Sequence, residues 1–268
     1  MALDTVAFIH SRQVFTLAEA RRALRPAGTV GTVRNRLKRY LRTGRLLSVS
    51  RGIYAAVPFG MEAERFQPDP FLVASSARSD AVFSHYSAIT LLGAARVVWK
   101  ALTVLTASPR GALEMKNARV HFLAHPPPLA RRRQTLLGVR SVDRSGRALR
   151  VTGPERTLVE GFRSPRRVGG LAELVAAGAS FPVLDLDLVE RILRAYDEKV
   201  LWAAVGWFLE GHRATFSVPD ACLTRLESRR PKSRLYLARG EGPGRLASRW
   251  NLMLPSGLTS SEPDERDR

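Results

Sequence analysis

The chain has 268 residues, enough for two modest domains, and its 45% hydrophobic and 25% charged residues are typical of globular proteins. Its single cysteine, Cys222, excludes a disulfide framework and a multi-cysteine zinc site. The opening residues lack the basic start of a signal peptide, and Arg96 and Lys100 interrupt the longest apolar stretch. We therefore expect a cytoplasmic protein that has no membrane partner.

The net charge of +19 favours binding to a polyanion, and nucleic acid is the commonest polyanion in a cytoplasm. Arginine outnumbers lysine 38 to 5, a bias that a GC-rich genome also produces, so the distribution of the charge is more informative than its total. Residues 1–60 carry 11 basic and 2 acidic residues, whereas the other 208 residues carry 32 and 22. We therefore expect the nucleic-acid surface within residues 1–60.

Two helices are predicted at the start of this basic region. The first spans residues 3–11, and the second begins at Thr16, because Thr16 and Glu19 have the spacing of a capping box. The segment Arg-Pro-Ala-Gly at residues 25–28 ends the second helix with a turn.

A third helix is predicted over residues 32–43, with Gly44 as its C-terminal stop. At 100° per residue its apolar side chains share one arc: Val33, Leu37, Tyr40 and Leu41. The opposite arc is basic, with one amide: Arg34, Asn35, Lys38, Arg39 and Arg42. Residues 45–55 then have the pattern of two strands around a tight turn at Arg51 and Gly52. Three helices followed by a hairpin is the order of a winged helix-turn-helix domain, which we expect over residues 1–60.

This arrangement predicts a DNA-binding surface. A helix fits the major groove of B-DNA, where arginine recognises guanine and asparagine recognises adenine. Arg34 and Asn35 are therefore the candidates for base recognition, and Lys38, Arg39 and Arg42 are expected to hold phosphates. Further DNA contacts are expected from the helix start and the hairpin, at Thr32, Ser48, Ser50 and Arg51. The alternative explanation is an ordinary solvated basic face.

The rest of the chain is predicted to be a linker over residues 61–68, a mixed α/β domain over residues 69–254 and a disordered tail over residues 255–268, so the fold class is α+β. Helices are expected over residues 70–77, 80–92, 154–162, 169–178, 185–196 and 199–212. Strands are expected over residues 101–106 and 119–123, on both sides of Ser145 and Gly146, and over residues 235–237.

Several of these segments resemble AbiEi-type antitoxins. In the N-terminal region they are Phe15-Thr16-Leu17-Ala18-Glu19-Ala20, Thr32-Val33-Arg34-Asn35-Arg36-Leu37, Gly44-Arg45-Leu46 and Arg51-Gly52-Ile53-Tyr54. Further along they are Ser84-His85-Tyr86-Ser87-Ala88 with Gly93, Thr152-Gly153-Pro154-Glu155-Arg156-Thr157-Leu158-Val159 and Arg249-Trp250-Asn251-Leu252. Gly153 stands where the family usually has aspartate. The resemblance covers most of residues 13–254, and the shared order of the motifs is more specific than any one of them.

The resemblance implies a transcriptional repressor that binds repeats in its own promoter. It also implies the antitoxin of a type IV toxin–antitoxin pair, which opposes a nucleotidyltransferase toxin without a stable complex between the two proteins. We predict no cofactor and no enzymatic activity. A DNA-binding regulator of unrelated genes, without a toxin, is a further possibility that the neighbouring gene would distinguish.

The alternative function is a nuclease or another nucleic-acid enzyme that the winged helix directs to its target. Asp185 and Asp187 have the spacing of metal-binding carboxylates, but acidic residues at a helix start are the simpler explanation. Glu114-Met115-Lys116 and Asp197-Glu198-Lys199 match a nuclease pattern by spacing alone, and no well-placed aspartate precedes Glu114.

Two other groups of residues carry weaker signals. The histidines are dispersed, which gives no support to a metal site, and we predict no metal ligand. His85, next to Ser84, lacks an acid placed to orient it and is expected to line the core.

The residues Arg131 to Arg133 are predicted to form a surface loop that either is only solvated or extends the contact with nucleic acid. With Arg140, Arg144, Arg147 and Arg150 they make a second cationic stretch.

Overall fold

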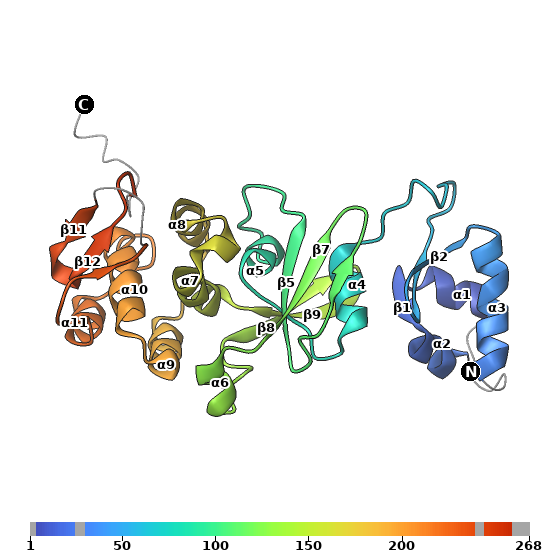
Figure 1. Cartoon of the computed structure of the whole chain (residues 1–268), viewed down its shortest axis with the longest axis horizontal. Helices are drawn as coiled ribbons and strands as arrows, with labels where there is room; N and C mark the ends of the chain where they lie inside the picture. The colour runs from blue at the N-terminus through green and yellow to red at the C-terminus, as the bar shows by residue number, and fades with distance from the viewer. Residues whose placement is uncertain (1–3, 25–29, 239–243, 259–268) are drawn as a thin grey trace.

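The computed structural model describes residues 4–24, 30–238 and 244–258. Over these residues the fold is α+β, with eleven α-helices and three β-sheets. The elements follow one another along an elongated molecule: an N-terminal unit at one end, a six-stranded sheet in the middle, and a helical region with a small third sheet at the other end (Figure 1). No helix within the described ranges is long and apolar enough to cross a membrane.

The N-terminal unit combines three helices with a three-stranded antiparallel sheet of order β1-β3-β2. Its elements are α1 (Thr5–His10), β1 (Val14–Thr16), α2 (Leu17–Ala23), α3 (Val30–Arg42), β2 (Leu46–Ser50) and β3 (Ile53–Ala56). The predicted capping box is confirmed, because the Glu19 N–H donates to Thr16 Oγ1 over 3.1 Å and the Glu19 carboxylate accepts from the Thr16 N–H over 2.6 Å. Strand β1, which the sequence pattern did not predict, places Val14 opposite Ala55.

Helix α3 starts two residues before its predicted position, so Thr32 lies inside its first turn. The predicted stop is confirmed, since Gly44 has a φ of +68° that an L side chain rarely adopts. The predicted turn at residues 25–28 lies outside the described residues.

The middle of the molecule is a mixed sheet of order β6-β7-β5-β4-β9-β8, in which β4 runs parallel to β9 and β5 runs parallel to β7. Its strands and helices are α4 (Pro70–Ala77), β4 (Val82–Phe83), α5 (Tyr86–Leu91), β5 (Ala101–Thr106), β6 (Ala112–Glu114), β7 (Arg119–Ala124), α6 (Pro127–Arg131), β8 (Val139–Arg144) and β9 (Arg147–Thr152). Phe71 of α4 and Ala88 of α5 join the apolar side chains of the strands in one core cluster. Asp69 caps α4, and Pro70 occupies its first position, as predicted.

The helix predicted over residues 80–92 is wrong in its first half. Val82 and Phe83 form the central strand β4, which pairs with β5 on one side and β9 on the other. The chain then turns at His85, whose φ is +53°, and only Tyr86–Leu91 are helical. Both β4 side chains are fully buried. Pairing with two neighbouring strands therefore overrides a local apolar pattern that also fits a helix.

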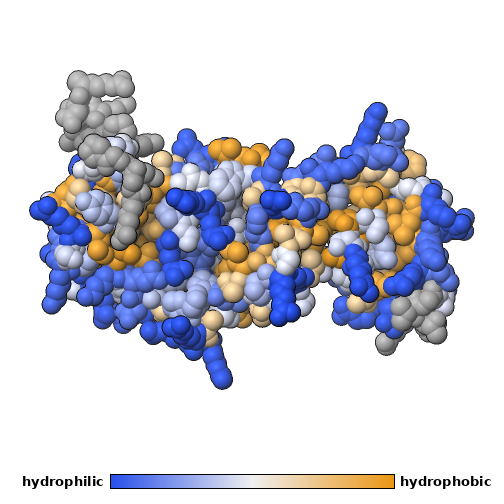
Figure 2. All heavy atoms as spheres, viewed as in Figure 1, coloured by the Kyte–Doolittle hydropathy of each residue, from blue (hydrophilic) through white to orange (hydrophobic). Residues whose placement is uncertain are grey.

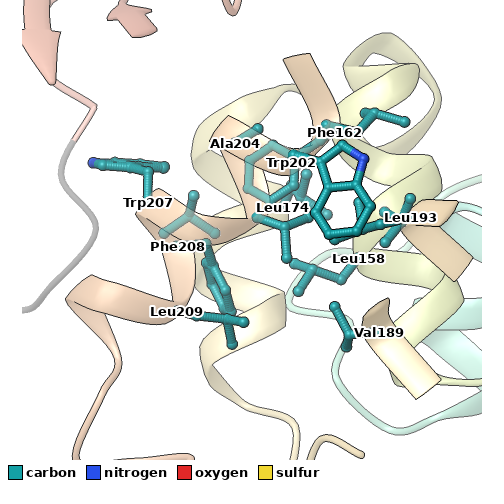
Figure 3. Close-up of a cluster of buried hydrophobic side chains, with 14 of the residues drawn as sticks. Leu158, Phe162, Leu174, Val189, Leu193, Trp202, Ala204, Trp207, Phe208 and Leu209 are labelled. Carbon is teal, nitrogen blue, oxygen red and sulfur yellow. The ribbon is translucent and has the colours of Figure 1, made fainter. Parts of the chain in front are cut away.

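The helical region begins at Pro154 and packs around the largest core cluster of the molecule. Its elements are α7 (Pro154–Arg163), a 3₁₀ turn (Pro165–Val168), α8 (Leu171–Ala179), α9 (Leu186–Tyr196), α10 (Lys199–Gly211), α11 (Asp220–Ser228), β10 (Leu235–Tyr236), β11 (Arg245–Ala247), a second 3₁₀ turn (Ser248–Trp250) and β12 (Leu252–Leu254). Figure 3 shows side chains of this cluster from several helices, with Trp202, Phe208 and Leu158 among those labelled. Strands β11 and β12 were not predicted. Leu258 still packs on this cluster, beyond Pro255 where the predicted tail begins, and residues 259–268 lie outside the described part.

A buried polar network lies where α7 meets α9. The Arg156 guanidinium is fully buried; its Nε donates to Glu160 Oε1 over 2.8 Å and its Nη1 donates to the Thr135 carbonyl over 2.7 Å. The Tyr196 hydroxyl donates to the same Glu160 oxygen over 2.6 Å. Burial, followed by the negative charge of Glu160, raises the pKa of Tyr196 far above its ordinary value. The Tyr196 phenol therefore stays protonated at neutral pH and keeps its hydrogen bond to Glu160.

The N-terminal unit is fastened to the middle of the molecule by an apolar contact and an arginine. Strand residues Val14, Ile53 and Ala55 cluster with Leu72 and Val73 of α4. At the edge of this contact the Arg147 Nη2 donates to the Val14 carbonyl over 2.9 Å and lies 3.2 Å from a Glu19 carboxylate oxygen, while Nη1 donates to the Ser76 hydroxyl over 2.5 Å. These contacts join β1, β3 and the start of α2 to α4 and to the central sheet.

Candidate nucleic-acid interface

Helix α3 has a buried face and an exposed face, as its sequence predicts. Val33 and Leu37 are 3% and 0% exposed and pack with Phe8 and Phe15 in the core of the N-terminal unit. On the other face, all the side chains that the sequence predicts to contact bases or phosphates are exposed: Arg34, Asn35, Lys38, Arg39 and Arg42. Arg36 of the same helix is exposed as well. The helix therefore presents five cations and one amide to solvent.

The exposed cations of α3 have no acidic partners among the described residues, and this distinguishes them from many arginines elsewhere in the chain. In the middle and C-terminal parts, ion pairs join Arg119 to Glu114 over 2.5 Å and Arg163 to Glu198 over 2.7 Å, and Arg249 contacts two glutamates. Five cations without an acidic partner in the described part of the chain thus share one 13-residue helix at one extremity of the molecule. Figure 2 shows hydrophilic residues along the same edge, where Figure 1 places α3.

A shallow hollow on α3 brings part of the predicted set together. Asn35, Lys38 and Arg42 line it, with the half-buried Leu41 beside them. These side chains lie three or four residues apart and so project from one side of the helix. An amide and two cations that converge on one hollow can contact a base edge and the phosphates next to it at the same time.

The hairpin residues lie outside this hollow. Ser48 is exposed on β2 opposite Tyr54, Ser50 is half-buried opposite Ile53, and Arg51 is exposed at the turn. Gly52 makes the tight turn possible with a φ of +76°, and its carbonyl accepts from the Leu17 N–H over 2.9 Å. The hairpin tip is therefore tied through its backbone to the start of α2. Thr32 is half-buried in the first turn of α3.

The second cationic stretch differs from the prediction. Arg131 ends the short helix α6, so the segment is not simply a loop, and Arg131 to Arg133 are exposed. Three of the other four arginines are engaged: Arg140 with Glu155, Arg144 with Asp69 and Arg147 with Glu19. Much of this charge serves the fold.

Two of the residues weighed for catalysis, Asp185 and Glu114, have structural partners. Asp185 caps α9 by accepting from the Leu188 N–H over 2.9 Å. Glu114 pairs with Arg119 across the β6–β7 hairpin, and Asp197 lies at the α9–α10 junction with a φ of +56°. No cluster of three or more histidine, cysteine or acidic residues within the described ranges is arranged to hold a metal ion.

His85 and Ser84 are buried together, with 3.0 Å between His85 Nδ1 and the Ser84 hydroxyl. Burial lowers the pKa of His85 to about 4, so the imidazole is neutral at physiological pH. Ser84 is fully buried, so no substrate reaches its hydroxyl without local opening.

A cationic hollow between the N-terminal unit and the central sheet was not predicted from the sequence. Arg12, Arg78, Arg147 and Arg150 line it together with Glu19. These residues come from segments far apart in the chain, so no local pattern signals their proximity. Arg78 and Arg147 donate to carbonyl oxygens, and Arg12 lies 3.6 Å from a Glu19 carboxylate oxygen. Arg150 is an exposed cation there without such a partner among the described residues.

Comparisons with known proteins inform the fold. No family model matches the chain, and no curated protein sequence matches it. The fold is similar to the crystal structure of the Rv2827c protein from Mycobacterium tuberculosis, with a TM-score of 0.58 and 19% sequence identity over 91% of this chain and 86% of that one. The similarity thus extends over nearly the whole architecture and, at this identity, concerns the fold alone.

Proposed function

We propose that the chain is a sequence-specific DNA-binding protein whose N-terminal unit is a winged helix-turn-helix domain. Helices α1 to α3 and the β2–β3 hairpin follow one another in the order of that domain. The observation that carries the proposal is the exposed basic face of α3, where five cations without an acidic partner among the described residues lie beside Asn35 on one helix.

In this proposal α3 enters the major groove. Arg34 and Asn35 contact base edges, and Lys38, Arg39 and Arg42 contact phosphates on the two sides of the groove. Thr32 supports the helix start against a phosphate, and Ser48, Ser50 and Arg51 of the hairpin contact the backbone or the adjacent minor groove. The structural partners of Asp185 and Glu114 give those carboxylates a role without catalysis, and we propose no enzymatic activity.

We further propose that the protein represses its own promoter and acts as the antitoxin of a type IV toxin–antitoxin pair. This part rests on the resemblance of its motifs to AbiEi-type antitoxins, and it requires a gene for a nucleotidyltransferase-like toxin next to this one. A single α3 covers a short DNA site, so strong specificity requires two copies on repeated half-sites.

The test is a titration of the full chain on the DNA directly upstream of its gene and on scrambled DNA of equal length, at several salt concentrations. Arg34→Ala/Asn35→Ala is expected to lose the preference for the upstream DNA and to keep salt-sensitive binding to both, because each bidentate base contact supplies about 1–3 kcal/mol of discrimination. Lys38→Ala/Arg39→Ala is expected to weaken binding to both DNAs alike and to reduce the salt slope by about 1 for each lost phosphate contact.

Arg191→Ala is the charge-matched control for Arg34→Ala/Asn35→Ala, since Arg191 is exposed on α9, far along the chain from α3, and has no ion pair among the described residues. It removes one positive charge and is expected to leave both affinities unchanged. If the wild-type chain binds upstream and scrambled DNA equally at physiological salt, the proposal of sequence-specific autoregulation is wrong.

A further inference from the structure

A second candidate site is a cavity of about 690 Å³ bordered by α5, β5, the segment that joins them, and the turn between β6 and β7. Pockets for small ligands occupy roughly 300–1,000 Å³, so this volume suits a ligand the size of a nucleotide. Helix α5 and strand β5 lie in the middle of the molecule, whereas α3 lies at one end (Figure 1). We refer to it as the Trp99 cavity.

One wall of the Trp99 cavity is aromatic and held in place. The Tyr86 hydroxyl donates to the Val97 carbonyl over 2.8 Å and accepts from the Val97 N–H over 3.1 Å, which fastens the α5–β5 segment onto α5. The same hydroxyl lies 3.2 Å from a carboxylate oxygen of Glu173, which is not among the lining residues of the cavity. The Trp99 ring stacks on the Tyr86 ring, with 4.7 Å between centroids and 21° between planes. Trp99 is nevertheless 37% exposed. A fixed indole with accessible surface is a stacking platform for a planar ligand.

The lining of the cavity is strongly cationic. It includes Arg96, Lys100, Lys116 and Arg144 and no acidic residue. Arg144 is paired with Asp69 over 2.6 Å, but the other three are exposed and have no ion pair in the described part of the chain. Three unneutralised cations around one cavity favour a ligand that carries phosphate.

The cavity lining also contains the side-chain amide of Asn117. The Nδ2 of this amide donates to the Pro68 carbonyl over 3.4 Å. Its Oδ1 is buried without a hydrogen-bond partner. A buried acceptor without a partner costs free energy unless a donor reaches it. The exocyclic amino group of a nucleobase is such a donor once the Asn117 amide turns toward the cavity.

We propose that the Trp99 cavity binds a nucleotide, with the base stacked on Trp99, an amino group of the base toward Asn117, and the phosphates among Arg96, Lys100 and Lys116. The ligand is either a free nucleotide or the terminal nucleotide of a single strand, because both present the same base and phosphate. The site is separate from the α3 surface and does not depend on the proposed DNA-binding function.

The experiment is calorimetric titration of the full chain with AMP, ATP, adenosine and inorganic phosphate, and with short single-stranded and blunt duplex oligonucleotides. Binding of a nucleotide or of a single strand at one site per chain is expected, with weaker binding of adenosine and of phosphate alone. Lys100→Ala/Lys116→Ala is expected to weaken binding about tenfold. Lys199→Ala/Lys232→Ala, which removes the same charge from exposed positions outside the cavity lining, is expected to leave binding unchanged.

A second pair of variants tests stacking without changing charge. Trp99→Leu is expected to weaken binding about tenfold, whereas Trp99→Phe retains most of the affinity because the ring remains. Equal affinity for mononucleotides and single strands identifies a free nucleotide as the ligand, and binding of single strands alone identifies a strand end. The proposal is overturned if the wild-type chain binds neither, if a polyglutamate peptide binds as tightly as the nucleotide, or if Lys100→Ala/Lys116→Ala binds like wild type. Arg34→Ala/Asn35→Ala must bind the nucleotide like wild type, and loss of binding there would also overturn the site.

Discussion

The His85 imidazole is 6% exposed, and its neutral form is the one that the fold accommodates. Desolvation depresses its pKa to about 4, and the nearby carboxylate of Glu160 opposes that shift only in part. An unfolded histidine has a pKa near 6.5, so between these two values the unfolded chain binds one more proton than the folded chain. The contribution of His85 to stability is therefore fully present above the pKa of the unfolded chain and is lost as the pH falls toward the pKa of the folded chain.

We predict that the free energy of unfolding of the wild type falls by about 2 kcal/mol more between pH 7 and pH 5 than that of His85→Gln, because the amide cannot be protonated. Urea unfolding of both chains at the two pH values measures the difference. His125, whose pKa is also lowered by burial, is present in both chains and cancels. Parallel pH profiles for the two chains would contradict the prediction.

Single residues also show where inference from sequence ends. The capping roles of Thr16, Asp69 and Asp185 were predictable because each partner lies within three residues in the chain. The buried Arg156 was not, since its partners include the carbonyl of Thr135, 21 residues earlier. Arginine is rarely buried, and only its tertiary partners explain the burial.

At the scale of elements, α10 packs closely on Trp250 because residue 206 is glycine. A Cβ added at Gly206 would lie 2.1 Å from the Trp250 ring, which is fully buried, and the Trp250 Nε1 donates to Glu210 over 2.7 Å. The close approach of helix and ring thus joins α10 to the last strands of the chain.

We predict that Gly206→Ala destabilises the protein by about 2 kcal/mol, because overpacking outweighs the gain of about 1 kcal/mol in helix propensity. Thermal and urea unfolding measure the change. Combining it with Trp250→Leu, which shortens the opposing side chain, is expected to cost less than the sum of the two single variants. A stabilised Gly206→Ala variant would show that the ring shifts aside freely.

Elements with local signals were predictable from the sequence, and elements defined by pairing were not. The amphipathic helix α3, the hairpin turn at Gly52 and the helix from Leu186 to Tyr196 follow from periodicity, turn chemistry and caps. Strand β4 has two residues and exists because β5 and β9 enclose it. The α3 surface was predictable because its residues lie close together in the sequence. The Trp99 cavity was not, because its lining comes from α5, β5 and the β6–β7 turn and so has no local sequence pattern.

At the scale of the whole molecule, Arg147 links the N-terminal unit to the sheet through the Val14 carbonyl, Glu19 and the Ser76 hydroxyl. We predict that Arg147→Ala costs about 2 kcal/mol and lets the N-terminal unit unfold before the rest, because these hydrogen-bond groups lose a charged partner. Arg147→Lys is expected to restore little, since an ammonium lacks the planar fork.

Hydrogen exchange resolved by segment measures this uncoupling, with faster exchange expected in β1 and β3 than in β5 and β7. Arg150→Ala is the control, because Arg150 is exposed on the same strand and has no ion pair among the described residues. Equal acceleration in every segment would mean that Arg147 supports overall stability and not the junction.

The order of the contacts along the chain has a consequence for synthesis. The N-terminal sheet is complete once β3 has been synthesised to Ala56. In contrast, β4 cannot pair with β9 until β9 has been synthesised, and the largest core cluster includes Trp250, near the end of the chain. At roughly 5–20 residues per second, the intervening stretch takes on the order of ten to forty seconds to emerge. During that interval a nascent chain still attached to its ribosome can carry a finished α3 surface, so the N-terminal unit matures well before the remainder of the protein.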